Sequence, residues 1–338
     1  MFSSILIFTV LLIPTFLVVY FGDRQGTNIE QSNSVHNGPV HINKEESFEI
    51  SVLRTNSGKI EKLPLEEYVV GVVASEMPVN FEPEALKAQS VAARTYTIKF
   101  LSSKDEDKVA NPNTVGADIT DNPDKHQIYK NRAELKQLWK NDYAENIKKI
   151  EAAVLSTAGE ILVYDNKPID ALFFSTSNGL TENSEDYWEH SVPYLKSVKS
   201  NWDEQQSPKF RSQLEYDLDK FTKTLGLENK MPVISDITKT TGNRVKSLKI
   251  NGSLFTGKQI REKLNLSSSD FEISLKRDLV IVTSIGNGHG VGMSQYGANG
   301  MALEGKKYID ILSYYYQDVN LDTTNTFINE RNEVVVRN

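Results

Sequence analysis

The sequence predicts an α+β fold: a mixed sheet core with packed helices, a smaller inserted subdomain and an N-terminal membrane anchor. Strand and helix patterns mix along the 338 residues without a strict βαβ rhythm, which argues against a doubly wound sheet. A hairpin pattern flanked by helix signals predicts the inserted subdomain at about residues 210–266. An apolar run from Ile5 to Phe21 predicts the anchor.

This apolar run of about 17 residues is at the short limit for crossing a bilayer. Gly22-Asp23-Arg24 follows it directly, and no small-residue cleavage motif appears. Residues 1–22 therefore predict an uncleaved transmembrane anchor, with a removed signal peptide as the alternative. Residues 23–47 are rich in Asn, Gln, Ser and Gly, which predicts a flexible stalk that holds a globular domain of residues 48–338 off the membrane.

The first half of the globular domain shows clear start and stop signals. Residues 48–53 alternate as a strand does, and Asn56-Ser57-Gly58 turns the chain back. Pro64 opens a helix that must end by Pro78, and a second helix runs from Pro83 to about residue 100 with an alanine face. Residues 104–124 predict a surface excursion, and residues 133–155 predict a third helix.

Strands dominate the predictions for the remainder. They lie at residues 159–164 and 171–174 around an Asp165-Asn166 turn, at 234–240 and 245–250 in the inserted hairpin, and at 279–282. The last of these leads into a glycine-rich run. Its glycines, Gly286, Gly288, Gly290 and Gly292, alternate with other residues.

Such a row of glycines is entropically costly unless something must approach the backbone closely. The neighbouring His289, Ser294, Gln295 and Tyr296 offer neutral hydrogen-bonding groups. We interpret the run as a surface for a neutral, hydroxyl-rich ligand. A phosphate ligand is disfavoured, because the run fits neither the dinucleotide nor the Walker pattern. The alternative is a tight turn ahead of a helix that starts near Ser294.

Composition excludes several other functions. The net charge of −7 argues against a nucleic-acid partner. The chain has no cysteine, so disulfides, a thiol nucleophile and Cys-based zinc sites are ruled out. The five histidines are scattered and form no His-Glu-x-x-His pattern, which disfavours a catalytic zinc. We therefore predict no cofactor and no metal.

Glu76 is the candidate catalytic acid. It follows the apolar stretch of residues 69–74 and precedes Met77-Pro78, so its carboxyl should lose hydration and have a raised pKa. Such a group can deliver a proton near neutral pH. The alternative is an exposed glutamate near a helix end, or one paired with Arg94.

A second polar loop, residues 175–181, follows a hydrophobic strand and includes Ser175 and Ser177. Its hydroxyls could bind a ligand, or they could only form the hydrogen bonds that stabilise a turn. The nearby Tyr187, Trp188 and Tyr194 could stack on sugar rings or pack a core.

Four blocks together carry a family resemblance: residues 73–78, residues 84–96, residues 173–179 and residues 288–298. In this order they resemble the stage II sporulation protein D family of peptidoglycan lytic transglycosylases. The resemblance covers about residue 48 to the C-terminus and extends to the anchor and stalk. It implies cleavage of the β-1,4 bond between N-acetylmuramic acid and N-acetylglucosamine, preferably in strands that an amidase has stripped of their peptides.

The resemblance also implies partners and a place. The partners are the amidase stage II sporulation protein P and the membrane protein stage II sporulation protein M. The place is the septum between the mother cell and the forespore, during engulfment. The protein would be single-pass in the cell membrane, with its catalytic domain outside the cytoplasm. Related amidase-enhancer proteins share the domain type, so the alternative is a non-catalytic wall-binding activator.

Residue by residue, the resemblance implies that Glu76 is the catalytic acid. Its implied substrate-binding residues are Arg94, Ser175, Ser177, His289, Ser294, Gln295 and Tyr296. Contact with Arg94 would lower the pKa of Glu76, so we expect Arg94 to face the helix exterior or the substrate. Some relatives resemble Cys-His zinc proteins in the loop of residues 117–126, where this chain retains only His126.

Overall fold

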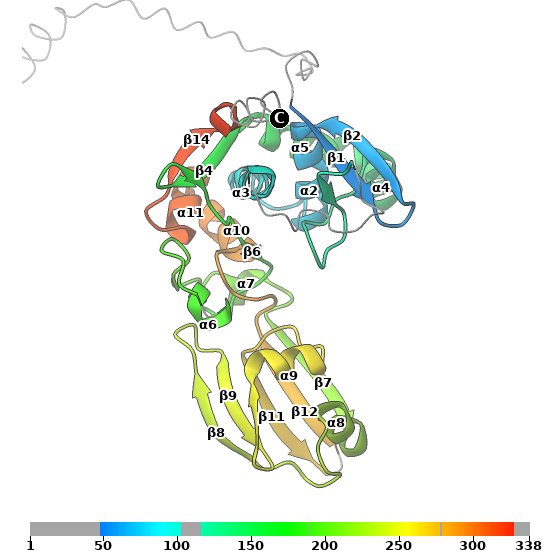
Figure 1. The fold of residues 1–338 in the computed structure, drawn as a ribbon, viewed down its shortest axis with the longest axis vertical. Coiled ribbons are helices and arrows are strands. Elements are labelled where there is room, and N and C mark those ends of the chain that lie inside the picture. Colours follow the sequence, from blue (N-terminus) through cyan, green and yellow to red (C-terminus); the bar gives the residue numbers. More distant parts are fainter. Residues whose placement is uncertain (1–47, 103–115, 189, 278, 328–338) are drawn as a thin grey trace, which may run out of the picture. The chain divides into compact units, whose positions relative to one another are not determined.

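The computed structural model describes residues 48–102, 116–188, 190–277 and 279–327 (Figure 1). Within these ranges, no helix combines the length and the apolar character that a bilayer crossing requires. The predicted anchor (1–22) and stalk (23–47) lie outside the described residues. Both therefore remain predictions.

Most of the described chain consists of helices and short strands. In chain order these are β1 (Glu49–Arg54), β2 (Lys59–Pro64), α2 (Leu65–Glu76), α3 (Pro83–Ser102), β3 (Ile119–Thr120), α4 (Arg132–Trp139), the 3-10 helix η2 (Lys140–Asp142), α5 (Tyr143–Leu155), β4 (Glu160–Tyr164), β5 (Lys167–Pro168), β6 (Phe173–Phe174), α6 (Ser184–Trp188), α7 (Asp203–Gln206), β13 (Met293–Ser294), α10 (Gln295–Leu303), α11 (Tyr308–Tyr315) and β14 (Asn320–Thr323).

Helix α3 is the centre of the hydrophobic core. It packs against α2, α5, α10, α11 and β4, which surround it in Figure 1. Its alanines Ala85, Ala88, Ala92 and Ala93 are fully buried, and their small side chains let neighbouring elements approach closely. The predicted second helix and its alanine face are confirmed.

Helix α2 delivers Glu76 to the surface of this core. Pro64 precedes its first residue, and most of its side chains are buried. The helix ends at Glu76 because Met77, as the residue before Pro78, adopts an extended conformation (φ −117°, ψ 138°). The predicted helix between Pro64 and Pro78 is confirmed.

The mixture of helices and strands is confirmed, but a single mixed sheet at the core is not. The described strands form five small sheets of two or three strands each. Strand β1 pairs with β2 in the predicted hairpin and also pairs in parallel with β3, which lies inside the predicted excursion of residues 104–124. The predicted sheet is replaced because the long buried helix α3 occupies the centre, leaving room only for short strands around it.

Two further predictions need correction. The third helix, predicted to be continuous over residues 133–155, is split into α4 and α5, because Lys140 has a positive φ and a non-helical backbone (φ 49°, ψ −114°). The strand predicted at residues 171–174 is reduced to β6, which pairs in parallel with β13. The Asp165-Asn166 turn is present, with positive φ at both residues.

The inserted region has a hydrophobic core of its own. Its elements are β7 (Arg211–Asp217), α8 (Leu218–Leu225), β8 (Ile234–Lys239), β9 (Val245–Ile250), β10 (Ser253–Thr256), α9 (Gly257–Lys263), β11 (Phe271–Lys276) and β12 (Leu279–Ile285). The predicted hairpin is β8 and β9. The hydrophobic core of this region includes residues from Phe221 to Val282. It extends past residue 266, the predicted end of the inserted subdomain, because β12 pairs with both β7 and β11.

Candidate active site

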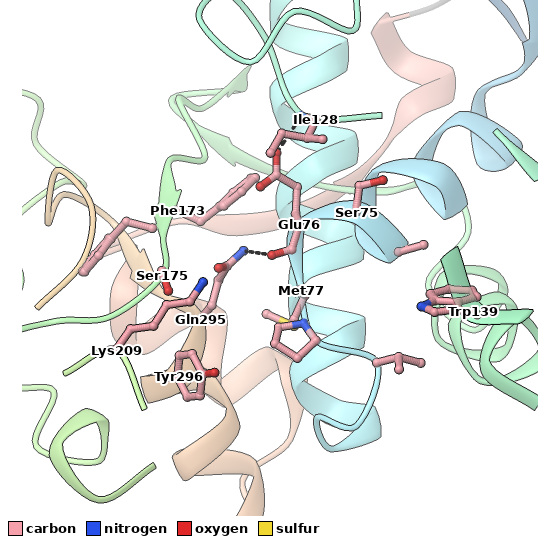
Figure 2. Close-up of a pocket in the computed structure, with 14 residues that line it drawn as sticks. Ser75, Glu76, Met77, Ile128, Trp139, Phe173, Ser175, Lys209, Gln295 and Tyr296 are labelled. Carbon is pink, nitrogen blue, oxygen red and sulfur yellow. Dashed lines mark hydrogen bonds between the residues drawn. The ribbon is translucent and has the colours of Figure 1, made fainter. Parts of the chain in front are cut away.

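A cleft of about 490 Å³ opens beside the C-terminal end of α2 (Figure 2). Segments from across the chain line it: the end of α2 and the loop after it, the loop before α4 and the end of α4, β6, the segment after α7, and the start of α10. Its lining residues are Ala74, Ser75, Glu76, Met77, Pro78, Val79, Ile128, Trp139, Phe173, Phe174, Ser175, Lys209, Gln295 and Tyr296. Among these residues, Glu76 is the only carboxylic acid.

Burial raises the pKa of the Glu76 carboxyl. A hydrogen bond from the Ile128 amide to Oε1 (2.6 Å) and the positive charge of Lys130 oppose this shift, but the net direction is upward. Glu76 is also the last residue of α2, where the partial negative charge of the helix end disfavours a carboxylate. The side chain can therefore hold a proton at a pH where an exposed glutamate has lost it.

Three predicted substrate-binding residues join Glu76 in this cleft. Gln295 is the first residue of α10, and its Nε2 donates to the Glu76 carbonyl across 3.1 Å. Tyr296 follows it and packs edge-on against Phe81, with ring centroids 4.9 Å apart. Ser175 follows β6 and is half-buried in the cleft wall. The parallel pairing of β13 with β6 brings the two loops together.

Arg94 lies elsewhere, which corrects the prediction that it faces the substrate or the helix exterior. Its side chain is fully buried, and Nε and Nη2 donate to the two carboxylate oxygens of Glu66 at 2.8 and 2.6 Å. Nη1 donates to the carbonyl of Glu160. Arg94 thus ties α3 to α2 and to β4. The partner of Arg94 is Glu66 rather than Glu76.

Ser177 and Ser294 also differ from their predicted role, since both are fully buried. The Ser177 amide and the Ser294 hydroxyl donate to the same carboxylate oxygen of Asp203, and Ser200 donates to the other oxygen (2.6 Å). Burial raises the pKa of Asp203. Asp203 therefore joins the two polar loops behind the cleft, and its long-range role had no signal in the sequence.

His289 is not among the residues that line the Glu76 cleft, so its predicted substrate-binding role stays a prediction. The Val291 amide donates to Nδ1 (3.1 Å), so the proton lies on Nε2, which donates to the Phe173 carbonyl (3.1 Å). Burial lowers its pKa to about 4. Both ring nitrogens thus form hydrogen bonds with backbone groups, and the neutral ring packs against Phe174, Tyr187 and Trp188.

The glycine run meets its own chain rather than an open surface. All four of its alternating glycines have positive φ. A Cβ at Gly290 would lie 2.3 Å from Cζ of Arg244, and one at Gly292 would lie 2.1 Å from the carbonyl of Leu172. Gly286 and Gly288 face Thr176 and Phe174 in the same way. This packing argues against the interpretation as a ligand surface. A helix begins directly after Ser294, as the alternative predicted, but the run ahead of it forms bridges to Thr176 and Glu182 rather than a tight turn.

Sequence reasoning missed four cleft residues, Val79, Ile128, Trp139 and Lys209. Trp139 ends α4, and Lys209 lies in the exposed segment after α7. Neither belongs to a motif, so only the tertiary structure places them here. Three aromatic residues were predicted to stack on sugars or pack a core. Of these, Tyr194 is buried, and its hydroxyl accepts a hydrogen bond from the Asp170 amide. Tyr187 and Trp188 line a second hollow of about 370 Å³.

Similarity to known proteins shows the family of this chain. The mixed α/β fold presents one acid, Glu76, in a cleft lined by aromatic and amide side chains. The family described as SpoIID: Stage II sporulation protein matches residues 54–164. Stage II sporulation protein D of Bacillus subtilis (strain 168) is 45% identical over 97% of this chain and 96% of its own length. The chain belongs to the Stage II sporulation protein D family.

Two further relatives support this assignment. Stage II sporulation protein D of Bacillus amyloliquefaciens is 43% identical over 95% of this chain and 94% of its own. The amidase enhancer of Bacillus subtilis (strain 168) is 29% identical over 74% of this chain but 40% of its own length. The amidase enhancer is thus a more distant relative with additional sequence. In the described part of the chain, no three His, Asp or Glu side chains gather as metal ligands would.

Proposed function

We propose that this protein is a peptidoglycan lytic transglycosylase that cleaves the β-1,4 bond between N-acetylmuramic acid and N-acetylglucosamine. The observation that carries this proposal is Glu76, a carboxyl with a raised pKa in a cleft whose described lining contains no second acid. Hydrolytic glycosidases ordinarily use two carboxyls. A single acid fits a reaction in which the substrate supplies its own nucleophile.

The proposed reaction balances with this one proton. The Glu76 carboxyl protonates the glycosidic oxygen, the bond to the anomeric carbon breaks, and N-acetylglucosamine leaves with a free hydroxyl. The resulting carboxylate then accepts the proton of the muramoyl C6 hydroxyl, whose oxygen bonds to the anomeric carbon. A 1,6-anhydro ring forms without water, and Glu76 ends protonated as it began.

The cleft residues support this sequence of events. Gln295 holds the backbone of Glu76, and the Ile128 amide holds its carboxyl, which fixes the acid in place. Trp139, Phe173 and Tyr296 offer rings that suit the faces of sugars. The pKa of Glu76 is raised by burial, so the acid form needed for the first step persists toward neutral pH.

Location and partners follow from the family resemblance and stay part of the proposal. Residues 1–22 would anchor the protein in the cell membrane, with the described domain on the extracytoplasmic side. Stage II sporulation proteins P and M would be its partners during engulfment. Co-purification of either protein with the full chain, compared with a chain lacking residues 1–22, tests both claims. Absence of both proteins from the full-chain sample would reject the partner proposal.

The test of the activity uses purified sacculi and the Glu76→Gln variant, which keeps the size of the side chain but cannot donate the proton. We expect the wild type to release 1,6-anhydro-muropeptides, detected by mass spectrometry, and the variant to release none while still binding sacculi. The alternative, a non-catalytic activator of an amidase, is favoured by the amidase-enhancer relative. Product from neither protein would support that alternative, whereas equal product from both would show that Glu76 is not the catalytic acid.

A further inference from the structure

Lys209 is the one fixed positive charge among the described residues that line the Glu76 cleft. The cleft's other groups are aromatic, apolar, hydroxyl or amide, apart from Glu76 itself. The chain as a whole carries a net charge of −7. A lysine that faces a cleft in an acidic protein indicates that some part of the ligand is an anion.

The backbone of Lys209 is held firmly. Its amide donates to Oγ of Ser207 (3.1 Å), and that hydroxyl shares a 2.7 Å hydrogen bond with Thr176 in the loop after β6. The carbonyl of the next residue, Phe210, accepts from the Gly286 amide (2.7 Å). The segment that carries Lys209 is therefore attached on both sides to the loops that build the cleft.

The ammonium group of Lys209, by contrast, has no carboxylate partner among the described residues. Figure 2 shows the side chain extending past Ser175 toward Gln295, on the opposite side of Glu76 from Trp139. A fixed backbone with an unpaired charge at the cleft wall is the arrangement expected of a ligand-binding cation. In the proposed substrate, N-acetylglucosamine has no charged group, so the anion must belong to the muramoyl unit.

We infer that Lys209 is a specificity-determining residue that pairs with the lactyl carboxylate of a muramoyl unit. This inference rests on the proposed function. When a stem peptide is attached, the lactyl carboxyl is an amide and has no charge. When the peptide has been removed, the carboxyl is free and ionised at neutral pH. Lys209 therefore distinguishes free muramoyl carboxylates from amidated ones at the cleavage site.

The test compares two glycan preparations that differ only in this group. Strands freed of peptide are used as the free acid or after conversion of the lactyl carboxylates to neutral methylamides. The full-length wild type should have a kcat/KM for release of 1,6-anhydro ends about fivefold higher on the free acid, the size expected of a solvent-exposed ion pair. Lys209→Met should reduce this ratio to about one, and Lys209→Arg should retain it.

The matched control is Lys306→Met, since Lys306 is an exposed lysine outside the cleft and should leave the ratio as in the wild type. Binding of the same two ligands is measured by calorimetry on Glu76→Gln and on Glu76→Gln/Lys209→Met, which does not depend on turnover. A binding preference that disappears with Lys209→Met supports the inference even when no anhydro product forms. A wild-type ratio of one, or a preference that survives Lys209→Met, overturns it.

Discussion

The side-chain amide of Gln295 donates a hydrogen bond to the backbone carbonyl of Glu76 across 3.1 Å, joining residues 219 positions apart. This contact ties the start of α10 to the end of α2. The carbonyl it satisfies belongs to the last turn of a helix, where carbonyls lack partners within the helix. Gln295 thus fixes the position of the candidate acid without touching its carboxyl.

We expect Gln295→Leu to lower kcat by about 10- to 100-fold, because small displacements of a catalytic group are costly. Gln295→Glu should be similarly impaired, since a carboxylate cannot donate to the Glu76 carbonyl. Rates are measured as release of 1,6-anhydro ends, and circular dichroism checks that the variants fold. Full activity in Gln295→Leu would show that the hydrogen bond does not position Glu76.

The raised pKa of Glu76 predicts a loss of activity on the basic side. The acid form is needed for the first step, so kcat should fall as the pH rises through the raised pKa of this carboxyl. A profile of kcat against pH measures this fall in rate on the basic side. A fall centred at the pKa of an ordinary glutamate would contradict the raised pKa.

The same shift predicts a change in stability with pH. Between the unfolded pKa near 4.5 and the raised folded pKa, the native state binds more protons, so the free energy of unfolding falls as the pH rises. Glu76→Gln removes this titration. Its free energy of unfolding relative to that of the wild type should therefore be higher at pH 8 than at pH 4.5. Urea unfolding at the two pH values measures the difference, and an equal effect at both would refute the prediction.

Arg94→Met is expected to destabilise the protein by about 3–5 kcal/mol, because it leaves the Glu66 carboxylate without its cation partner. The paired variant Glu66→Leu/Arg94→Met should recover part of this loss, since no unpaired charge remains. Urea unfolding measures both. Unchanged stability together with weaker substrate binding would instead favour the role predicted from the sequence, direct contact with substrate.

Gly290→Ala tests the packing of the glycine run. The position has a φ of +89°, and the new Cβ would lie 2.3 Å from Cζ of the buried Arg244. Backbone strain of about 1–2 kcal/mol and overpacking of about 1–3 kcal/mol should add. Gly305→Ala is the control, because it has a similar φ of +84° but open space around it. Equal destabilisation of the two variants, measured by thermal unfolding, would argue against the close packing on Arg244.

Local sequence signals were sufficient for several elements and for the position of Glu76 at the end of its helix. Pro64 and Pro78 bracket α2 and place Glu76 at its end, because a proline acts on its immediate neighbours. The turn at residues 55–58 and the alanine face of α3 depend equally on residues close in sequence. Gln295, Tyr296 and Ser175 were also predicted to face the site, and they do line the cleft.

Which polar residues face the cleft was decided only by tertiary structure. Arg94 pairs with Glu66 on another helix, and Ser294 bonds to Asp203, 91 positions away. Lys209 has no motif, yet its segment is fixed beside the Glu76 cleft. The physical reason is that a hydroxyl or a charge has the same local pattern whether it binds a ligand or satisfies a buried partner. The distinction lies in long-range neighbours, which spacing along the chain does not contain.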